Sequence, residues 1–317
     1  MAVLPDADII VVDWRFLLQN LSHSIRSASI ACSYPTEPEE ISHRVMKRLF
    51  CIRADAPYAK IVLAVDTKPY WRDAFIQKWY SDRGLEPVVY KGNRAKLSWQ
   101  FVTSPDEMEQ LYRILLKHGA KSIGAMVVQD QGLEADDIFG IIAKTYNGTV
   151  LGITGDSDWA ALISDRVFVY NFAIDEMMTW KDVRIKYVGG DPGDNVPGIP
   201  KLKKDGTPAA NNWGQLGASK LLAEHPDDWH VGLDADHLER NYQIVTLPCP
   251  DWDAKQAMLG LNEITTVYNQ TDEFWSRYGV TLPVRKALDS KAARDAWVAK
   301  LRIHILEANK PSLQKEE

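Results

Sequence analysis

The chain has 317 residues, of which 45% are apolar and 25% are charged, which is the composition of an ordinary globular protein. No stretch approaches the roughly 18 apolar residues of a membrane span, and the first residues lack the features of a secretory signal, so we expect a cytoplasmic protein without membrane spans. The net charge of −6 excludes a uniformly basic surface, although carboxylates gathered at one metal site would be cancelled by bound cations.

Two continuous apolar runs, Ala7–Asp13 and Lys60–Asp66, each end in an aspartate. Runs of this kind are typical of strands that are buried on both faces of a sheet. Between them the apolar residues have helical spacing. The order is therefore strand, helices, strand.

The next elements continue this alternation. A helix is predicted from a capping-box start at Ser104 to a stop at Gly119. Strands are predicted over Ile123–Gln129 and Thr149–Thr154, with a helix between them that begins at Glu134. Strands that alternate with helices predict a parallel sheet in an α/β domain.

The character changes beyond Trp180. Asp191–Gln215 is rich in Pro, Gly, Asn and Lys and is predicted to be turn and loop, whereas Leu216–His225 is predicted to be a short helix. The rest is mainly helical in pattern. We expect an α/β catalytic domain over residues 1–185 and a smaller helical domain over residues 186–317.

Acidic residues recur where these elements meet. They follow three predicted strands, open the helix in GLEADD, and occupy the turn GDPGDN. Because the carboxyl ends of parallel strands share one edge of a sheet, the loops there converge on a crevice. The set comprises Asp13, Asp66, Glu134, Asp136, Asp137, Asp156, Asp158, Asp191 and Asp194.

A cluster of oxygen ligands without Cys or His favours Mg²⁺ or Mn²⁺ over zinc. Two such ions roughly 4 Å apart would suit the hydrolysis of a phosphodiester. For any single aspartate, a helix cap or an Asx turn is the alternative interpretation. The recurrence at several strand ends favours the metal site.

A basic and aromatic segment, Tyr70–Phe101, follows the second strand and contains Arg72, Tyr90, Lys91 and Arg94. Basic groups that hold phosphates beside aromatic faces that stack on bases suit single-stranded nucleic acid. The alternative is a solvated amphipathic helix whose aromatic residues pack on the core.

Taken together, the motifs resemble those of the 5′ nuclease family, which includes phage 5′→3′ exonucleases, flap endonucleases, phage ribonuclease H and the 5′ nuclease domain of bacterial DNA polymerase I. The matching pieces are Asp13, Asp66 with the Tyr-Trp-Arg segment, YKGNR, GLEADD, TGDSDW and GDPGDNVPGI, in the family's order. The resemblance implies a PIN-like parallel sheet with a helical arch over about residues 68–104.

The resemblance also assigns the residues. Around one metal it places Asp13, Asp66, Glu134, Asp136 and Asp156, and around the second Asp158, Asp191 and Asp194, with Asp137 as a close neighbour. Lys91 and Arg94 would clamp the scissile phosphate from the arch. Tyr90 would stack on a base, and Arg72 would add a phosphate contact.

In the C-terminal part the resemblance implies a helix–three-turn–helix element that grips duplex DNA, often with K⁺. DNVPGIP and GQLGASKLLAEH resemble its two halves, and KLKKDGTPAANNW is an insertion between them. The insertion supplies Lys201, Lys203 and Lys204 as candidate DNA contacts, and the second half supplies Lys220.

The resemblance implies a Mg²⁺-dependent nuclease of DNA replication or recombination that acts on branched or 5′-ended DNA, and on RNA:DNA hybrids for primer removal. We expect a monomer, in the host cytoplasm if it is viral, that works beside a single-strand-binding protein or a polymerase. Two alternatives are a PIN-type single-stranded ribonuclease and a non-catalytic protein that binds DNA junctions.

Overall fold

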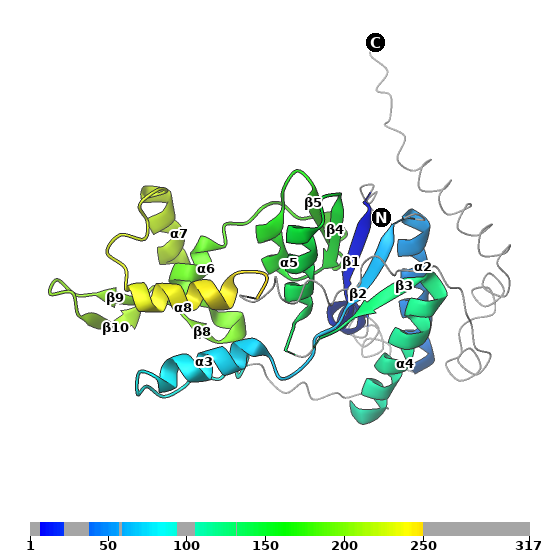
Figure 1. The fold of residues 1–317 in the computed structure, drawn as a ribbon, viewed down its shortest axis with the longest axis horizontal. Coiled ribbons are helices and arrows are strands. Elements are labelled where there is room, and N and C mark those ends of the chain that lie inside the picture. The colour runs from blue at the N-terminus through cyan, green and yellow to red at the C-terminus, as the bar shows by residue number, and fades with distance from the viewer. Residues whose placement is uncertain (1–6, 22–37, 57–58, 94–104, 131, 250–317) are drawn as a thin grey trace, which may run out of the picture.

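The computed structural model describes residues 7–21, 38–56, 59–93, 105–130 and 132–249. Its larger part has three layers, with a central sheet between two layers of helices (Figure 1). None of the helices in the described ranges is long and apolar enough to cross a membrane.

The sheet has six strands in the order β3-β2-β1-β4-β5-β6, all parallel except β6, which is antiparallel to β5. This confirms the predicted parallel α/β sheet. Its strands are β1 (Ile9–Asp13), β2 (Lys60–Ala64), β3 (Ala125–Val128), β4 (Val150–Thr154), β5 (Val167–Asn171) and β6 (Glu176–Met177).

The central strand β1 is buried on both faces, as its continuous apolar run predicted. Ile10 and Val12 face α2 (Pro38–Asp55) and α4 (Pro105–Ile123), whereas Ile9 and Val11 face α5 (Ala135–Thr145) on the other side. Alternate residues of one strand thus complete two separate apolar cores.

The helix α4 ends at Ile123 and not at the predicted stop, Gly119. A Cβ at Gly119 would lie 2.7 Å from Cδ1 of Leu49 on α2, so the glycine permits two helices to approach closely and does not end one. The chain leaves the helix at Gly124, whose φ is +62°. The predicted cap at Ser104 lies outside the described residues.

A second, smaller group of helices lies beside the sheet. It consists of α3 (Trp71–Ser81), α6 (Arg184–Gly189), α7 (Gln215–Glu224) and α8 (Ala235–Val245). Ile76, Trp79 and Tyr80 of α3 share an apolar cluster with Ile244 and Val245 of α8. The first part of the predicted arch is therefore a packed helix that runs along α8 (Figure 1).

The predicted turn-and-loop region holds more regular structure than expected. The insertion forms a hairpin of β9 (Pro200–Leu202) and β10 (Pro208–Asn212), which projects at the end of the molecule farthest from the sheet (Figure 1). Asp205-Gly206 at its tip is a turn signal that predicts a hairpin, and Gly206 has a φ of +81°.

The segment DNVPGIP is not helical, in contrast to a helix–three-turn–helix half. It contains β8 (Val196–Pro197), which pairs with β7 (Gly190–Asp191), and α7 packs against α6 instead. The domain boundary near residue 185 stays a prediction, and residues 250–317 lie outside the described part.

Candidate active site

Three aspartates leave adjacent strands at the same edge of the sheet. Asp13 is the last residue of β1, which pairs with β2 on one side and β4 on the other. Asp66 and Asp156 follow β2 and β4 by two residues each. The parallel sheet therefore brings these carboxylates together, as the sequence predicted.

Each of these carboxylates also accepts a backbone hydrogen bond. Asp13 accepts from the backbone N–H of Phe16 and from the hydroxyl of Thr154, both at 2.9 Å. Asp66 accepts from the N–H of Ala135 at 2.8 Å, and Asp156 from that of Asp158 at 3.0 Å. The capping interpretation therefore holds for Asp13 and Asp156, and these hydrogen bonds fix the direction of the side chains.

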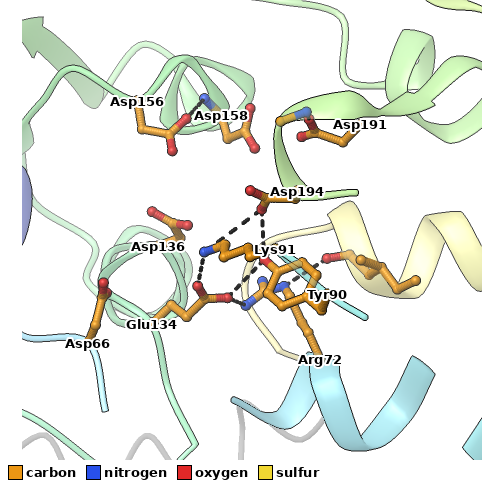
Figure 2. Close-up of polar contacts among 12 residues, drawn as sticks. Asp66, Arg72, Tyr90, Lys91, Glu134, Asp136, Asp156, Asp158, Asp191 and Asp194 are labelled. Carbon is orange, nitrogen blue, oxygen red and sulfur yellow. Dashed lines mark hydrogen bonds and ion pairs between the residues drawn. The ribbon is translucent and has the colours of Figure 1, made fainter. Parts of the chain in front are cut away.

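The carboxylates line two neighbouring cavities. One is an open groove of about 1470 Å³, lined by Asp13, Asp66, Glu134, Asp136 and Asp156. The other is a small pocket of about 10 Å³, lined in part by Asp136, Asp158, Asp191 and Asp194. The two sets correspond to the two groups that the resemblance implied, and Asp136 belongs to both cavities. Figure 2 shows these side chains, apart from Asp13, with Lys91 between Glu134 and Asp194.

Burial and mutual repulsion disfavour ionisation at this edge. Burial, followed by the charge of Asp66, raises the pKa of Asp13 to about 7. The pKa of Asp136 is raised well above its ordinary value by burial and then by Asp156 and Glu134. Burial and Asp156 also raise the pKa of Asp158 to about 6. The protein therefore brings together more carboxylates here than can all be ionised without added positive charge.

Two lysines partly offset that charge. Lys91, whose φ of +55° is unusual for a residue with a side chain, contacts Glu134 and lies 3.8 Å from Asp194. Lys186 contacts both Asp158 and Asp191. Burial acts to lower the pKa of each lysine, but the neighbouring carboxylates raise it above its ordinary value, so both stay cationic.

In the described ranges, no three Asp, Glu, His or Cys side chains are arranged so that they could hold a metal ion. The donor chemistry still fits a hard cation, because every candidate ligand is a carboxylate oxygen. Lys91 and Lys186 lie where positive charge is required.

The structure places three of the assigned residues, Asp137, Arg72 and Tyr90, where they do not fit the roles expected from the sequence. Asp137 is fully buried, and both of its oxygens accept from Arg72, at 2.8 and 2.9 Å. Arg72 is itself only 3% exposed and therefore cannot contact a DNA phosphate. These two residues form a buried ion pair, which the i,i+1 acids of GLEADD did not reveal.

Tyr90 is the third of these residues. It is buried, with its hydroxyl 2.8 Å from Asp194 and 3.1 Å from Glu134, so its ring is not available to stack on a base. Burial raises the pKa of Tyr90 far above its ordinary value, so the group remains a neutral donor. Tyr70 lines the groove instead, together with Trp14, Phe16 and Tyr112.

Most of the basic residues assigned to DNA lie on the hairpin and on α7. Lys203 and Lys204 are exposed at the hairpin tip, Lys201 lies over the ring of Trp213 with Nζ 4.9 Å from its centroid, and Lys220 is exposed on α7. Arg94 lies outside the described residues.

Sequence reasoning missed several residues that shape the site. Lys186 has no signal in the sequence, because α6 brings it to Asp158 and Asp191 only in the fold. Trp159 donates to Asp136 at 2.6 Å from within TGDSDW. The groove also has basic residues at its margin, namely Arg15, Lys68, Arg113 and Lys117.

Known proteins resemble this chain in sequence. A 5′-3′ exonuclease of Buchnera aphidicola subsp. Schizaphis graminum is 29% identical over 128 residues, which cover 36% of this chain and 42% of that protein. A thermostable DNA polymerase I of Thermus filiformis is 26% identical over 206 residues, 54% of this chain and 24% of the polymerase. The match thus spans less than half of either relative.

A solved structure of T5 5′-exonuclease with bound divalent metal ions (zinc) is 16% identical, with a TM-score of 0.48, and the alignment covers 94% of this chain and 98% of that one. A family model described as the 5′-3′ exonuclease N-terminal resolvase-like domain matches residues 10–188, more than half of the chain. The protein therefore belongs to the 5′-3′ exonuclease family.

Proposed function

We propose that the protein is a metal-dependent 5′ nuclease that hydrolyses phosphodiester bonds in branched or 5′-ended DNA. The observation that carries the proposal is the convergence of carboxylates from three strand ends, from the start of α5, and from β7 and the turn after it, on a groove and on the small pocket beside it. This amount of buried negative charge requires cations, and oxygen ligands favour Mg²⁺ or Mn²⁺.

The residues would divide between two cation positions. Asp13, Asp66, Glu134, Asp136 and Asp156 would hold one ion at the groove, and Asp158, Asp191 and Asp194 would hold the second, with Asp136 between them. When bound, the ions would supply an activated water and neutralise the leaving oxygen.

The side chains of the groove suit the rest of the substrate. Lys91 is placed to exchange its carboxylate contacts for a phosphate when cations enter, and the basic residues at the margin would guide the strand. Tyr70, which lies with its ring centroid 5.2 Å from Lys91 Nζ, is the candidate for stacking on a terminal base.

Flap cleavage and the removal of RNA primers are part of the proposal. The C-terminal helices and the lysine-bearing hairpin would hold the duplex, with K⁺ bound as in the element that the resemblance implies. The domain boundary near residue 185 would then separate chemistry from duplex binding.

The test compares two aspartate-to-asparagine substitutions, one inside the candidate site and one outside it. Asp156→Asn should reduce Mg²⁺-dependent cleavage of a 5′-flap DNA by at least about 100-fold, because it removes a ligand and a charge. Duplex binding, followed by fluorescence anisotropy, should stay within about threefold of that of the unmodified protein, since the lysines remain.

The matched control is Asp8→Asn. Asp8 also accepts a backbone hydrogen bond, from Thr149 at 2.8 Å, but it precedes β1 at the opposite edge of the sheet. Cleavage should be unchanged in this variant. End-labelled flap, nicked-duplex, RNA:DNA and single-stranded RNA substrates should be assayed together, and full activity of Asp156→Asn, or cleavage of the single-stranded RNA alone, would contradict the proposal.

A further inference from the structure

Arg72 joins three elements through one buried guanidinium. From the start of α3 it donates to the carbonyl of Ile244 near the end of α8 at 2.8 Å, and to Glu134 at the start of α5 at 2.7 Å. Asp137 accepts two further bonds, at 2.8 and 2.9 Å (Figure 2 shows Arg72 beside Glu134). A planar fork of fixed donors suits such a junction.

Glu134 is held asymmetrically by this arrangement. Its Oε2 accepts from Arg72 and lies 3.1 Å from the hydroxyl of Tyr90, both of which are buried. Its Oε1 is the atom that Lys91 contacts, and Lys91 lines the groove. One oxygen is therefore fixed by the interior of the protein while the other is directed to the cation side.

The charges around Arg72 support the same division of roles between the two oxygens of Glu134. Asp137 forms a two-pronged pair with Arg72 and offsets its charge. The negative charge of Glu134 is therefore not consumed by Arg72 and remains for a cation in the groove. If Arg72 only neutralised a buried acid, one carboxylate partner would be enough. Arg72 instead donates to two carboxylates, those of Glu134 and Asp137.

We infer that Arg72 is a positioning residue that holds Glu134 in the orientation required for cation binding, and that it makes this orientation depend on the end of α8. The inference rests on the proposed function, because it gives Glu134 a cation to bind. Because Arg72 is bonded to both the Ile244 carbonyl and Glu134, a displacement of α8 would move Arg72 and, with it, the carboxylate of Glu134.

The variant Arg72→Lys keeps the charge but cannot reproduce the planar set of bonds. Residues that orient metal ligands typically change metal affinity by about 10- to 100-fold when they are replaced. We expect Arg72→Lys to weaken Mn²⁺ binding by about tenfold, as measured by electron paramagnetic resonance of free Mn²⁺. The kcat on flap DNA should fall, whereas the KM should stay within about twofold.

The control is Arg240→Lys. Arg240 is equally buried. It ties α8 to α3 through the hydroxyl of Tyr80 at 3.0 Å, and to β8 through the carbonyl of Pro197 at 2.8 Å. It donates to Tyr80, Pro197 and Asn241, none of which is a carboxylate of the site. Arg240→Lys should lower the Tm to a similar degree and leave the Mn²⁺ affinity of the folded protein unchanged.

A double substitution separates positioning from general destabilisation. In a Glu134→Gln background, Arg72→Lys should weaken Mn²⁺ binding by less than about twofold, because the residue it positions has lost its charge. All measurements should be made at a temperature at which circular dichroism shows each variant to be folded. If Arg72→Lys does not fold, Arg72→Gln, which keeps one amide donor, takes its place.

The outcomes distinguish the two proposals. If the unmodified protein neither binds Mn²⁺ nor cleaves flap DNA, the proposed function is wrong. If it does both, but Arg72→Lys and Arg240→Lys have the same Mn²⁺ affinity, the positioning role of Arg72 is overturned. Equal effects of Arg72→Lys with and without Glu134→Gln would overturn it as well.

Discussion

At the scale of single residues, each aspartate of this edge accepts a backbone hydrogen bond and also lines the acidic groove. Asp13 fixes the start of the following helix through the N–H of Phe16 and also faces the acidic groove. The backbone bond stabilises its charged form, but burial and Asp66 outweigh that effect and raise its pKa to about 7. Capping is thus compatible with the proposed cation binding, and a bound cation would favour the charged form of Asp13.

The raised pKa of Asp13 predicts how stability changes with pH in the absence of divalent cations. Between about pH 4 and about pH 7 the folded protein retains a proton on Asp13 that the unfolded chain has released, so stability falls as the pH rises through this window. We expect the difference in free energy of unfolding between the unmodified protein and Asp13→Asn to fall by on the order of 2 kcal/mol.

Urea denaturation in EDTA at several pH values measures this difference. The asparagine is neutral throughout, so subtraction isolates Asp13 from the other carboxylates. Asp8→Asn, which alters an exposed carboxylate, serves as the control. A difference that stays constant over the window would show that Asp13 ionises normally in the folded state.

At the scale of elements, the hairpin β9–β10 is built as a stable projection. Lys203 N–H donates to the carbonyl of Thr207 at 2.8 Å, and Asp205 accepts from the N–H of Thr207 at 3.0 Å to close the tip. The turn presents Lys203 and Lys204 to solvent on a pre-formed arm. A pre-formed arm loses less conformational entropy on binding a phosphate backbone than a free loop would.

The hairpin predicts a change in the salt dependence of duplex binding. The double variant Lys203→Ala/Lys204→Ala should reduce the slope of log K against log salt concentration by about 1 for each lysine that contacts a phosphate. Cleavage at saturating DNA should not change, because the hairpin is remote from the carboxylates.

Anisotropy titrations at several salt concentrations measure the slope. Lys121→Ala/Lys144→Ala is the matched control, since these exposed lysines lie near the C-terminal ends of α4 and α5, away from the hairpin. If both double variants change the slope equally, the hairpin makes no specific contact with the duplex.

At the scale of the whole molecule, the candidate site is where the sheet and the second group of helices meet. The sheet side contributes Asp13, Asp66 and Asp156, whereas Asp191 ends β7 and Asp194 lies in the turn after it. Cations bound between them would therefore tie the two parts together. Their removal should loosen the molecule as well as stop the chemistry.

Divalent cations should accordingly raise the thermal stability. A ligand at about 100 times its dissociation constant adds roughly 2.7 kcal/mol, which corresponds to a Tm increase of about 5 °C or more for a chain of this size. Calorimetry in Mg²⁺ and in EDTA, at matched ionic strength with Na⁺, measures the shift. The shift should be smaller in Asp156→Asn, and an equal shift in that variant would place the stabilising ions elsewhere.

The sequence by itself determined the parallel sheet and the position of the acids along it. Continuous apolar runs that end in Asp13 and Asp66 require burial on both faces, and parallel strands place their carboxyl ends together whatever the surrounding sequence is. Local pattern also located α5 and α7. These features depend on neighbouring residues in the chain and can therefore be read from it.

Only the tertiary structure decided which charged residues face solvent and which face each other. Arg72 and Tyr90 have the residue types of DNA contacts, yet α8 covers Arg72, and Glu134 and Asp194 engage Tyr90. Lys186 contacts Asp158, which lies 28 residues earlier in the chain. Partners so distant in the chain leave no periodic signal, because their pairing depends on how the helices pack and not on local propensity.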